Sequence, residues 1–462
     1  MKENLGVYFM QDINQYYQDV TATQNNFKDI SKRLVALEKL KSSITEMSSE
    51  IADALRKDLG KCEFESYLSE IDFVLHEIDV AKKNIKKWSK PKRVSSSLAF
   101  FPVKSYIVPE PYGTVLIIGP WNYPFQLVLA PLVGAIAAGN TSIIKPSEMA
   151  PQTSKVITEL INKTFSKEVK CVEGGVPETT ELLDLKFDYI FYTGNGVVAR
   201  IIMEKASKFL TPLTLELGGK SPCMIFTANL NLAAKRVVWG KFFNAGQTCV
   251  APDYIMIQEK DKNSFINEMK KWIEFFYTSE VKSSPNYGRI INERHFDRLT
   301  KYLSEAKVLL GGGHERESLF LEPTVVEGDL NHAIMKEEIF GPILPIVIVK
   351  DYEEARDYVL KNDKPLASYG FFDREEDKSK FVKEISSGGM VINDTLIHLS
   401  NEKLPFGGVG ESGMGAYHGA YSFDIFSHKK ALMKRSFMFE NSLRYPPYEG
   451  KLNLIRNIMK YL

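Results

Sequence analysis

The chain has 462 residues, 44% hydrophobic and 25% charged, which is typical of a globular protein that folds in more than one lobe. Its 59 Lys and Arg residues nearly balance 58 Asp and Glu residues, so the net charge of +1 gives no general attraction for nucleic acid or an anionic membrane. The four cysteines form no CxxC pair and the seven histidines form no HExxH motif. With a charged residue early in the N-terminus, these counts predict a cytoplasmic protein without a metal.

The first 90 residues have the pattern of two helices. Residues 24–57 carry leucines on one face, and residues 63–90 begin with acidic residues, Glu70 among them, and end with the basic run KKNIKKWSKPKR. Basic residues suit the C-terminal end of a helix dipole, and they could also bind nucleic acid. No aromatic-rich basic groove accompanies the run, so we expect a solvated helix end.

After residue 93 the pattern becomes extended and then alternates between strand and helix. Residues 93–113 contain the β-branched residues and prolines of an extended arm. Strands are then expected at 114–118, 141–144 and 189–192, separated by the buried helix FQLVLAPLVGAIAAG, which is too short for a membrane span, and by a helix over 151–165. This alternation predicts an α/β protein with right-handed βαβ units and a parallel sheet, whose ligands bind at the carboxyl ends of the strands.

Three of these strand ends carry loops that could hold a ligand: GPWNYP, KPSE and TGNGVVA. The last has the form GxGxxA between a strand and a helix, as in a dinucleotide-binding turn, although glycine turns at such positions are common without a ligand. In KPSE, Lys145 and Glu148 could contact ribose hydroxyls or form a surface ion pair, and spacing alone does not decide. A second match, GVGESG at 408–413, follows a Pro-Phe-Gly turn and is interpreted as a loop hinge.

Glu216 and Cys249 are the candidates for the chemistry. Glu216 lies in LTLELGGKSP, where apolar neighbours would raise the pKa of its carboxyl toward that of a general base. Cys249 lies in NAGQTCVAP, a turn of small and polar residues with free N–H groups, which is a setting for a reactive thiol. Cys62, Cys171 and Cys223 lie in helical or apolar segments and are interpreted as inert.

These motifs occur together in one known family. PWNYP, KPSE, LELGGKSP, FNAGQTCVAPD, EEIFGP and PFGGVGESGMG follow one another as in the NAD(P)-dependent aldehyde dehydrogenases, which the chain resembles from about residue 25 to 445. GQTCVAPDY, the short N-terminus and the ending GAYHGAYSFDIFSH are similar to the class 3 branch, whose members act on fatty and aromatic aldehydes. The resemblance implies a Rossmann-like cofactor domain, an α/β catalytic domain and a small β dimerisation arm.

The resemblance also implies a domain organisation. Residues 1–92 and 114–218 would form the NAD(P)-binding domain, and residues 219–425 the catalytic domain. Residues 93–113 and 426–450 would form the oligomerisation arm of a homodimer. The tail over 451–462 has an amphipathic pattern, and we expect it to dock on its own subunit or its partner, with peripheral contact to a membrane surface as the alternative.

Each site residue receives a role from the same resemblance. Cys249 would attack the aldehyde carbon, and the amide of Asn122 with the Cys249 N–H would hold the oxyanion. Hydride would pass to the nicotinamide of NAD or NADP, and Glu216 would activate the water that hydrolyses the thioester. The implied cofactor contacts are Lys145, Glu148, Gly194, Glu338 and Phe340.

Two features of this assignment are open. Tyr123 and Trp239 either line a tunnel for an apolar aliphatic or aromatic aldehyde or simply fill the core. Ala199 stands where the family usually has a glycine in the helix after Gly194, and we expect the turn to survive because alanine is small.

Three other functions compete with this assignment: a CoA-acylating aldehyde dehydrogenase, a cysteine acyl-transferase or hydrolase without nicotinamide, and a non-catalytic protein that binds NAD. The presence of Cys249, Glu216 and Asn122 together favours catalysis. Glu216, as a base for water, favours hydrolysis over transfer to CoA.

Overall fold

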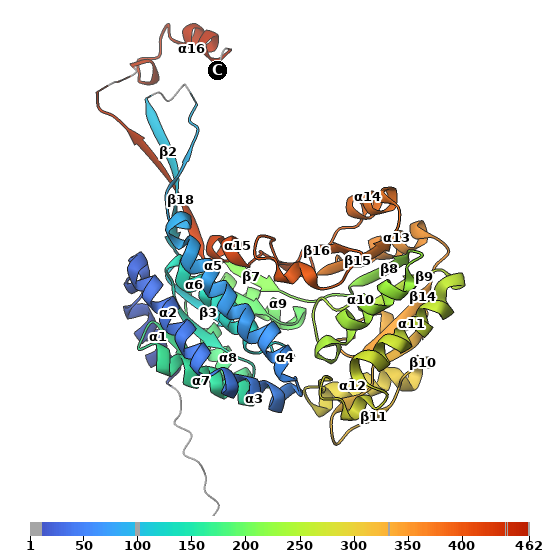
Figure 1. Ribbon diagram of the computed structural model, residues 1–462. Coiled ribbons are helices and arrows are strands. Elements are labelled where there is room, and N and C mark those ends of the chain that lie inside the picture. Colours follow the sequence, from blue (N-terminus) through green and yellow to red (C-terminus); the bar gives the residue numbers. More distant parts are fainter. Residues whose placement is uncertain (1–11, 98–101, 331–332, 439, 441, 461–462) are drawn as a thin grey trace, which may run out of the picture.

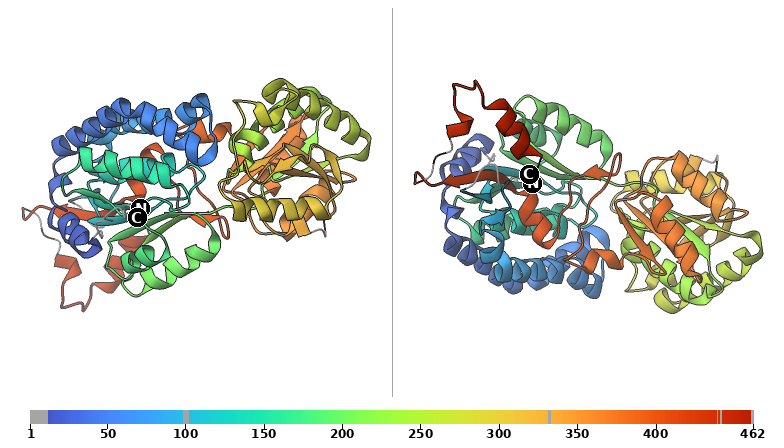
Figure 2. Two further views of the ribbon diagram at one scale, coloured as in Figure 1. Left: turned by 90° about the horizontal axis from the view of Figure 1, so that it is seen from below. Right: turned by 90° about the horizontal axis from the view of Figure 1, so that it is seen from above.

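The computed structural model describes residues 12–97, 102–330, 333–438, 440 and 442–460, which form two lobes and a projecting arm (Figure 1). Each lobe contains a largely parallel sheet with helices on its faces, and the lobes lie side by side when the molecule is viewed from above or below (Figure 2). The predicted α/β class with a Rossmann-like parallel sheet is therefore confirmed.

The first lobe has a six-stranded sheet in the order β17-β7-β6-β3-β4-β5. Its parallel strands are β3 (Thr114–Ile118), β4 (Thr141–Lys145), β5 (Val169–Cys171), β6 (Tyr189–Thr193) and β7 (Leu213–Glu216). The short β17 (Gly413–Met414) pairs antiparallel with β7 at the edge. Every residue of β3 is buried, as its continuous apolar run requires in a strand covered on both faces.

The buried helix predicted after β3 is α6 (Gln126–Ala138), all of whose residues are buried. Around it and on the other face of the sheet lie α1 (Ile13–Ala22), α2 (Ile30–Glu46), α3 (Ser48–Leu59), α4 (Glu63–Ser66), α5 (Asp72–Trp88), α7 (Pro151–Thr164), α8 (Val176–Leu183) and α9 (Gly196–Ser207).

The N-terminal helices are more divided than the sequence pattern indicates. The single helix predicted over 24–57 is a 3₁₀ turn followed by α2 and α3, and Asp29 begins α2 by accepting a hydrogen bond from the Ser31 N–H. The helix predicted over 63–90 is interrupted by a π-helical turn, η2 (Tyr67–Ile71), between α4 and α5. The basic end of α5 is exposed, as predicted.

The second lobe has a seven-stranded sheet in the order β10-β13-β14-β9-β8-β15-β16, parallel except for β10. Its strands are β8 (Pro222–Phe226), β9 (Tyr254–Ile257), β10 (Val308–Leu310), β13 (Thr324–Gly328), β14 (Ile343–Ile348), β15 (Ala367–Phe372) and β16 (Gly389–Ile392). Its helices are α10 (Leu230–Phe242), α11 (Glu259–Tyr277), α12 (Glu293–Glu305), α13 (Tyr352–Lys361) and α14 (Glu375–Glu384), with a hairpin of β11 (His314–Glu315) and β12 (Phe320–Leu321).

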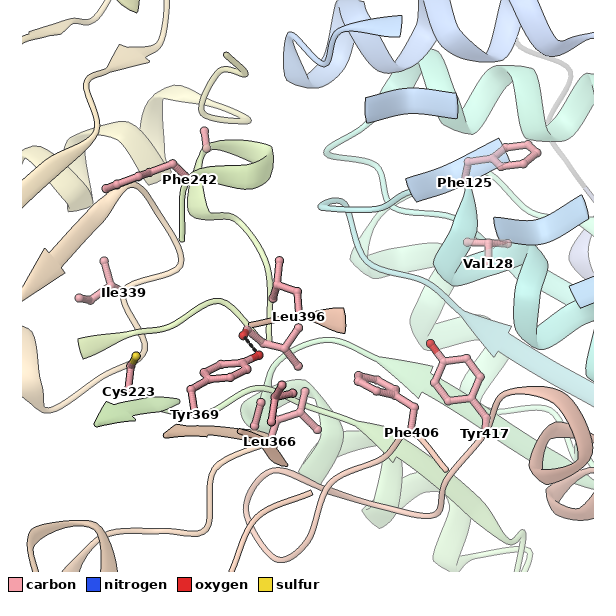
Figure 3. Packing of buried hydrophobic residues seen from close by; sticks show 14 of the residues in the cluster. Phe125, Val128, Cys223, Phe242, Ile339, Leu366, Tyr369, Leu396, Phe406 and Tyr417 are labelled. Atoms are coloured by element: carbon pink, nitrogen blue, oxygen red, sulfur yellow. Dashed lines mark hydrogen bonds between the residues drawn. The ribbon is translucent and has the colours of Figure 1, made fainter. Parts of the chain in front are cut away.

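One apolar core runs through both lobes. Figure 3 shows Leu366, Tyr369 and Leu396 of the second lobe near Phe406 and Tyr417, on the segment that returns to the first lobe. Because this core is continuous, the loops between the lobes are fixed by packing on both sides.

The returning segment departs from the predicted domain boundary at residue 425. β17 pairs with β7, and α15 (Gly419–Ile425) lies against α5 and α6 of the first lobe. Gly134 on α6 permits this approach, because a Cβ there would lie 2.7 Å from the Cβ of Ser422. The end of the range assigned to the catalytic domain thus packs on the cofactor lobe, and the remaining domain division stays a prediction.

The projecting arm is a three-stranded antiparallel sheet of β1 (Lys92–Val94), β2 (Val103–Pro111) and β18 (Ser427–Arg435). Beyond it lies α16 (Leu452–Met459), which exposes Leu452, Leu454 and Ile455. Leu462 of the predicted tail lies outside the described residues. None of the helices in the described part of the chain has the length and apolar content to cross a membrane.

Candidate active site

The predicted site residues meet between the two lobes. The loop after β3 carries Asn122, and β7 ends at Glu216. On the other side, Cys249 lies before β9 and Glu338 lies before β14. Residues from four separate regions of the sequence are therefore brought together, as the contacts below show.

Asn122 is buried and touches the cysteine loop directly. Its Nδ2 donates a hydrogen bond of 3.0 Å to the carbonyl of Gln247, two residues before Cys249. The hydroxyls of Tyr123 and Thr248 are 2.7 Å apart. These hydrogen bonds connect the loop from the first sheet to the loop with the thiol.

The cysteine loop has a strained backbone before the thiol. Asn244 and Ala245 both have left-handed conformations, with φ of 52° and 51°, and Gly246 follows with φ of 73°. Such conformations persist where surrounding contacts enforce them. The side-chain amide of Gln247 supplies these contacts, because its Nε2 donates to the carbonyls of Asn244 (3.1 Å) and Arg289 (2.9 Å).

Cys249 is half-buried at the end of this turn. Burial raises the pKa of its thiol, and the carboxyl groups of Glu338 and Glu216 raise it further. These two carboxyls therefore lie close enough to Cys249 to influence its thiol. Cys171 is buried within β5, which agrees with its interpretation as a core residue.

Glu216 is the last residue of β7 and is buried. Neither of its carboxylate oxygens has a hydrogen-bond partner among the described residues. Burial raises the pKa of Glu216 well above its ordinary value, as the apolar sequence around it predicts. A buried carboxyl with both oxygens free is able to take a proton from a water molecule.

The carboxyl edge of the first sheet has the groups that a dinucleotide needs. Lys145 ends β4, is buried, and its Nζ lies 2.8 Å from Glu148 Oε2, so the ion pair considered from the sequence does form here. The buried Thr193 Oγ1 at the end of β6 has no partner among the described residues. A cation and an unsatisfied hydroxyl at the ends of the two strands that flank β3 fit a phosphorylated nucleoside.

The turn after β6 is tightly packed. Gly194 donates its N–H to the carbonyl of Glu216 (3.0 Å), and a Cβ at Gly194 would collide with the ring of Tyr192. The helix α9 starts at Gly196, and Ala199 is buried within it. The turn therefore survives with Ala199 in place, as expected.

Glu338 lies against the chain just after β7. A Cβ at Gly218 would collide with its carboxylate, which lies near the backbone of Gly219. Burial, with a contribution from Asp253, raises the pKa of Glu338 to about 8. Phe340 packs edge-on against Trp121, with ring centroids 5.2 Å apart.

Lys220 and Asp253 support the segment that carries Glu338, and neither was named from the sequence. Lys220 Nζ contacts Asp253 and donates to the carbonyls of Ile334 (2.8 Å) and Glu337 (2.9 Å). Asp253 in turn accepts the N–H of Ile339 (3.1 Å). Lys220 lies in the motif LELGGKSP and Asp253 in FNAGQTCVAPD. Their positions in these motifs could have identified them as site residues from the sequence.

The two aromatic residues proposed for the substrate tunnel have different surroundings. Tyr123 is buried beside the cysteine loop, whereas Trp239 is half-buried and packs near Phe243, with ring centroids 5.8 Å apart. Their role as tunnel walls stays a prediction. Within the described residues, no group of three or more His, Cys, Asp or Glu side chains is arranged to hold a metal ion.

Comparison with known proteins agrees with this geometry. The family model described as the aldehyde dehydrogenase family matches residues 10–432. A 4,4'-diaponeurosporen-aldehyde dehydrogenase of Staphylococcus aureus is 48% identical over 98% of this chain and 100% of its own length. Aldehyde dehydrogenase family 3 member A2 of Mus musculus is 46% identical over 90% of this chain and 87% of its own.

A solved structure, described as the substrate-bound state of Staphylococcus aureus AldH, has a TM-score of 0.95 and 47% identity, covering 97% of this chain and 100% of its own. The family match extends over most of the chain, including all the site residues above. The chain therefore belongs to the aldehyde dehydrogenase family, resembles its family 3 members, and is an oxidoreductase that acts on aldehydes with NAD or NADP.

Proposed function

We propose that this protein oxidises an apolar aliphatic or aromatic aldehyde to its carboxylic acid through a thioester on Cys249. The observation that carries the proposal is the contact between the Asn122 amide and the Cys249 loop, beside a buried Glu216 whose carboxylate is free. An oxyanion donor, a nucleophile and a base are thus present in one place.

In the first step the Cys249 thiol gives up its proton to solvent, the thiolate sulfur adds to the aldehyde carbon, and negative charge develops on the carbonyl oxygen. A side-chain amide has two N–H donors, and Asn122 uses one for the Gln247 carbonyl. That bond fixes the plane of the amide, and the second N–H remains to stabilise the oxyanion together with the Cys249 N–H.

In the second step the carbon loses a hydride and becomes a thioester, and NAD or NADP supplies the acceptor when bound. Lys145 and Glu148 would contact one ribose, Gly194 would lie by the pyrophosphate, and Glu338 and Phe340 would lie near the nicotinamide end. Glu216 then removes a proton from water, which attacks the thioester carbon, and the Cys249 thiolate leaves.

The substrate class rests on the surroundings of the thiol. Tyr123 lies against the cysteine loop and Trp239 lies on α10, near the Phe243 that leads into it. The relative from Staphylococcus aureus is named for an aldehyde, 4,4'-diaponeurosporen-aldehyde. We extend an aldehyde substrate to this chain and assign it an apolar one because aromatic walls favour apolar ligands.

The arm supports a homodimer. β18 forms the outer edge of the arm, so its outer backbone groups have no strand partner among the described residues, and it exposes Met433. An uncovered edge strand favours pairing with another chain. We further propose that the protein acts in the cytoplasm, which suits its four free cysteines, and that the tail docks on protein.

The test is NAD(P)H formation across a series of aliphatic and aromatic aldehydes, with and without CoA. Cys249→Ala should reduce the rate by about 1,000-fold or more, since the covalent step is lost. Cys171→Ala, a buried cysteine on β5, is the matched control and should keep the parental rate. Free acid should form without CoA.

Two outcomes would contradict the proposal. Turnover of Cys249→Ala at the parental rate would exclude the covalent route. A strict requirement for CoA would identify the acylating type of enzyme instead.

A further inference from the structure

A buried ion pair lies directly behind the Asn122 loop. The side chains of Lys61 and Glu70 are both completely buried and contact each other. Lys61 precedes α4, and Glu70 lies in the π-helical turn η2. A buried pair of charges is costly to form and gives little net stability, so its position in the structure is informative.

Each member of the pair also bonds to the loop that carries Asn122. Lys61 Nζ donates to the carbonyl oxygen of Asn122 itself at 3.1 Å, and lies 3.9 Å from the centre of the Tyr123 ring. Glu70 Oε2 accepts the N–H groups of Phe125 (3.1 Å) and Gln126 (2.9 Å). The pair therefore fixes the backbone of the loop at its catalytic residue and again at the first turn of α6.

The same segment reaches the cysteine loop. Asn244 Nδ2 donates to the Asn122 carbonyl (2.8 Å) and to the Gln247 carbonyl (3.2 Å). Glu65, which is buried four residues after Lys61, lies near the Asn244 backbone. The Asn122 carbonyl is thus shared between Lys61 and the strained turn that leads to the thiol.

The π-helical turn explains how Glu70 reaches this position. An extra residue in a helical turn rotates the following side chains relative to a regular α-helix, and such turns occur frequently at functional sites. η2 lies between α4 and α5, and the completely buried Glu70 is within it.

We propose that Lys61 and Glu70 are positioning residues for the oxyanion site, holding the Asn122 amide and the turn at Asn244 in the geometry that the transition state requires. The inference rests on the proposed role of Asn122. Neither residue touches the reacting atoms; they act through the backbone of the Asn122 loop. Displacement of a catalytic group by about 1 Å is enough to reduce a rate by about 100-fold.

The test compares variants that keep the fold. Lys61→Met removes the bond to the Asn122 carbonyl, and the double variant Lys61→Met with Glu70→Gln removes both charges while leaving an acceptor for the N–H groups of Phe125 and Gln126. In both, kcat and the rate of the first turnover should fall by about 10- to 100-fold. The KM for NAD(P) should stay within about twofold, because Lys145 and Gly194 lie on other strand ends.

Arg33→Met is the matched control. Arg33 is a buried cation of the same lobe, and its guanidinium donates to the Ala137 carbonyl (3.1 Å) at the opposite end of α6. This variant should lower thermal stability while the folded protein keeps its kcat. Should Lys61→Met fail to fold, the double variant, which leaves no unpaired charge, decides the result.

A double-mutant cycle with Asn122→Ala distinguishes a positioning role from a nonspecific loss of structure. If the pair acts through Asn122, Lys61→Met should change kcat by no more than about twofold in the Asn122→Ala background. An equal loss in both backgrounds, or an unchanged kcat in the Lys61 variants, would overturn the inference. Normal turnover by Asn122→Ala would instead refute the proposed function of Asn122, which is a separate result.

Discussion

The two parallel sheets contribute to the active site from opposite edges. In the first sheet the functional residues follow the carboxyl ends of the strands: Asn122 after β3, Lys145 on β4, Gly194 after β6 and Glu216 on β7. In the second sheet they precede the amino ends: Cys249 before β9, and Glu338 and Phe340 before β14. The rule that ligands bind at the carboxyl ends of parallel strands therefore applies to the first lobe and not to the second.

The connection between the sheets accounts for this difference. The chain leaves the first sheet at Glu216 and enters the second at Pro222, so residues 217–221 are all that separate the end of β7 from the start of β8. This short link sets the carboxyl edge of one sheet against the amino edge of the other. The proposed dinucleotide site and the proposed nucleophile are then brought together by the connection itself.

The carboxyl edge of the second sheet is a contrasting surface. It has a hollow of about 470 Å³, lined by residues that include Phe226, Thr227 and Asp373. Asp373 there accepts the Thr227 hydroxyl and the Ala228 N–H (2.8 Å). Its carboxylate thus holds the turn before α10, whereas neither carboxylate oxygen of Glu216, at the carboxyl edge of the first sheet, has a partner in the described part of the chain.

The largest effect is expected where the two edges meet. Glu216→Gln should give one burst of NAD(P)H per active site and then a steady rate lower by about 100-fold or more, because deacylation lacks its base. Burial raises the pKa of Glu216, and the base works only when ionised. The parental deacylation rate should therefore rise with pH through that raised pKa, and the variant should lack this rise.

Rapid mixing for the burst and steady-state rates across pH would measure both effects. A steady rate equal to the parental one would remove Glu216 from deacylation. The buried Glu216 carboxyl at the end of β7 would then have no role in the proposed reaction.

A smaller effect, confined to cofactor binding, is expected at the carboxyl edge of the first sheet. Lys145→Met should raise the KM for NAD(P) by about tenfold, the value of one charged hydrogen bond, with little change of kcat at saturation. Lys170→Met on the neighbouring β5 is the control, because Lys170 bonds to the Ser166 carbonyl (2.7 Å). An equal KM effect in both variants would show that the cation at β4 has no special role.

The sequence predicts the first sheet well because its strands are short apolar runs bounded by Gly and Pro turns. The strand expected at 114–118 is β3, and the strands expected at 141–144 and 189–192 each extend by one residue in β4 and β6. The helix expected over 151–165 is α7, which ends at Thr164. Local pattern suffices here because each strand is covered on both faces.

The positioning residues could not be predicted from the sequence. Glu70 falls in an acidic stretch that has the pattern of a solvated helix face, yet its side chain is completely buried against Lys61. Burial of a charge depends on tertiary partners such as the N–H groups of Phe125 and Gln126, which lie far along the chain. The return of α15 to the first lobe depends on tertiary packing in the same way.

The smallest effect is expected at the carboxyl edge of the second sheet. Asp373→Ala should leave kcat and KM within about twofold and lower the free energy of unfolding by at most about 1 kcal/mol, because the lost hydrogen bonds are exposed. Asp253→Asn, at the amino edge of the same sheet, is the comparison, since Asp253 holds Lys220 and the Ile339 N–H beside Glu338. It should raise the KM for NAD(P) several-fold in the same assay. If the two aspartate variants lost activity equally, both edges of the second sheet would serve catalysis, and the short link at 217–221 would no longer explain which edge carries the site.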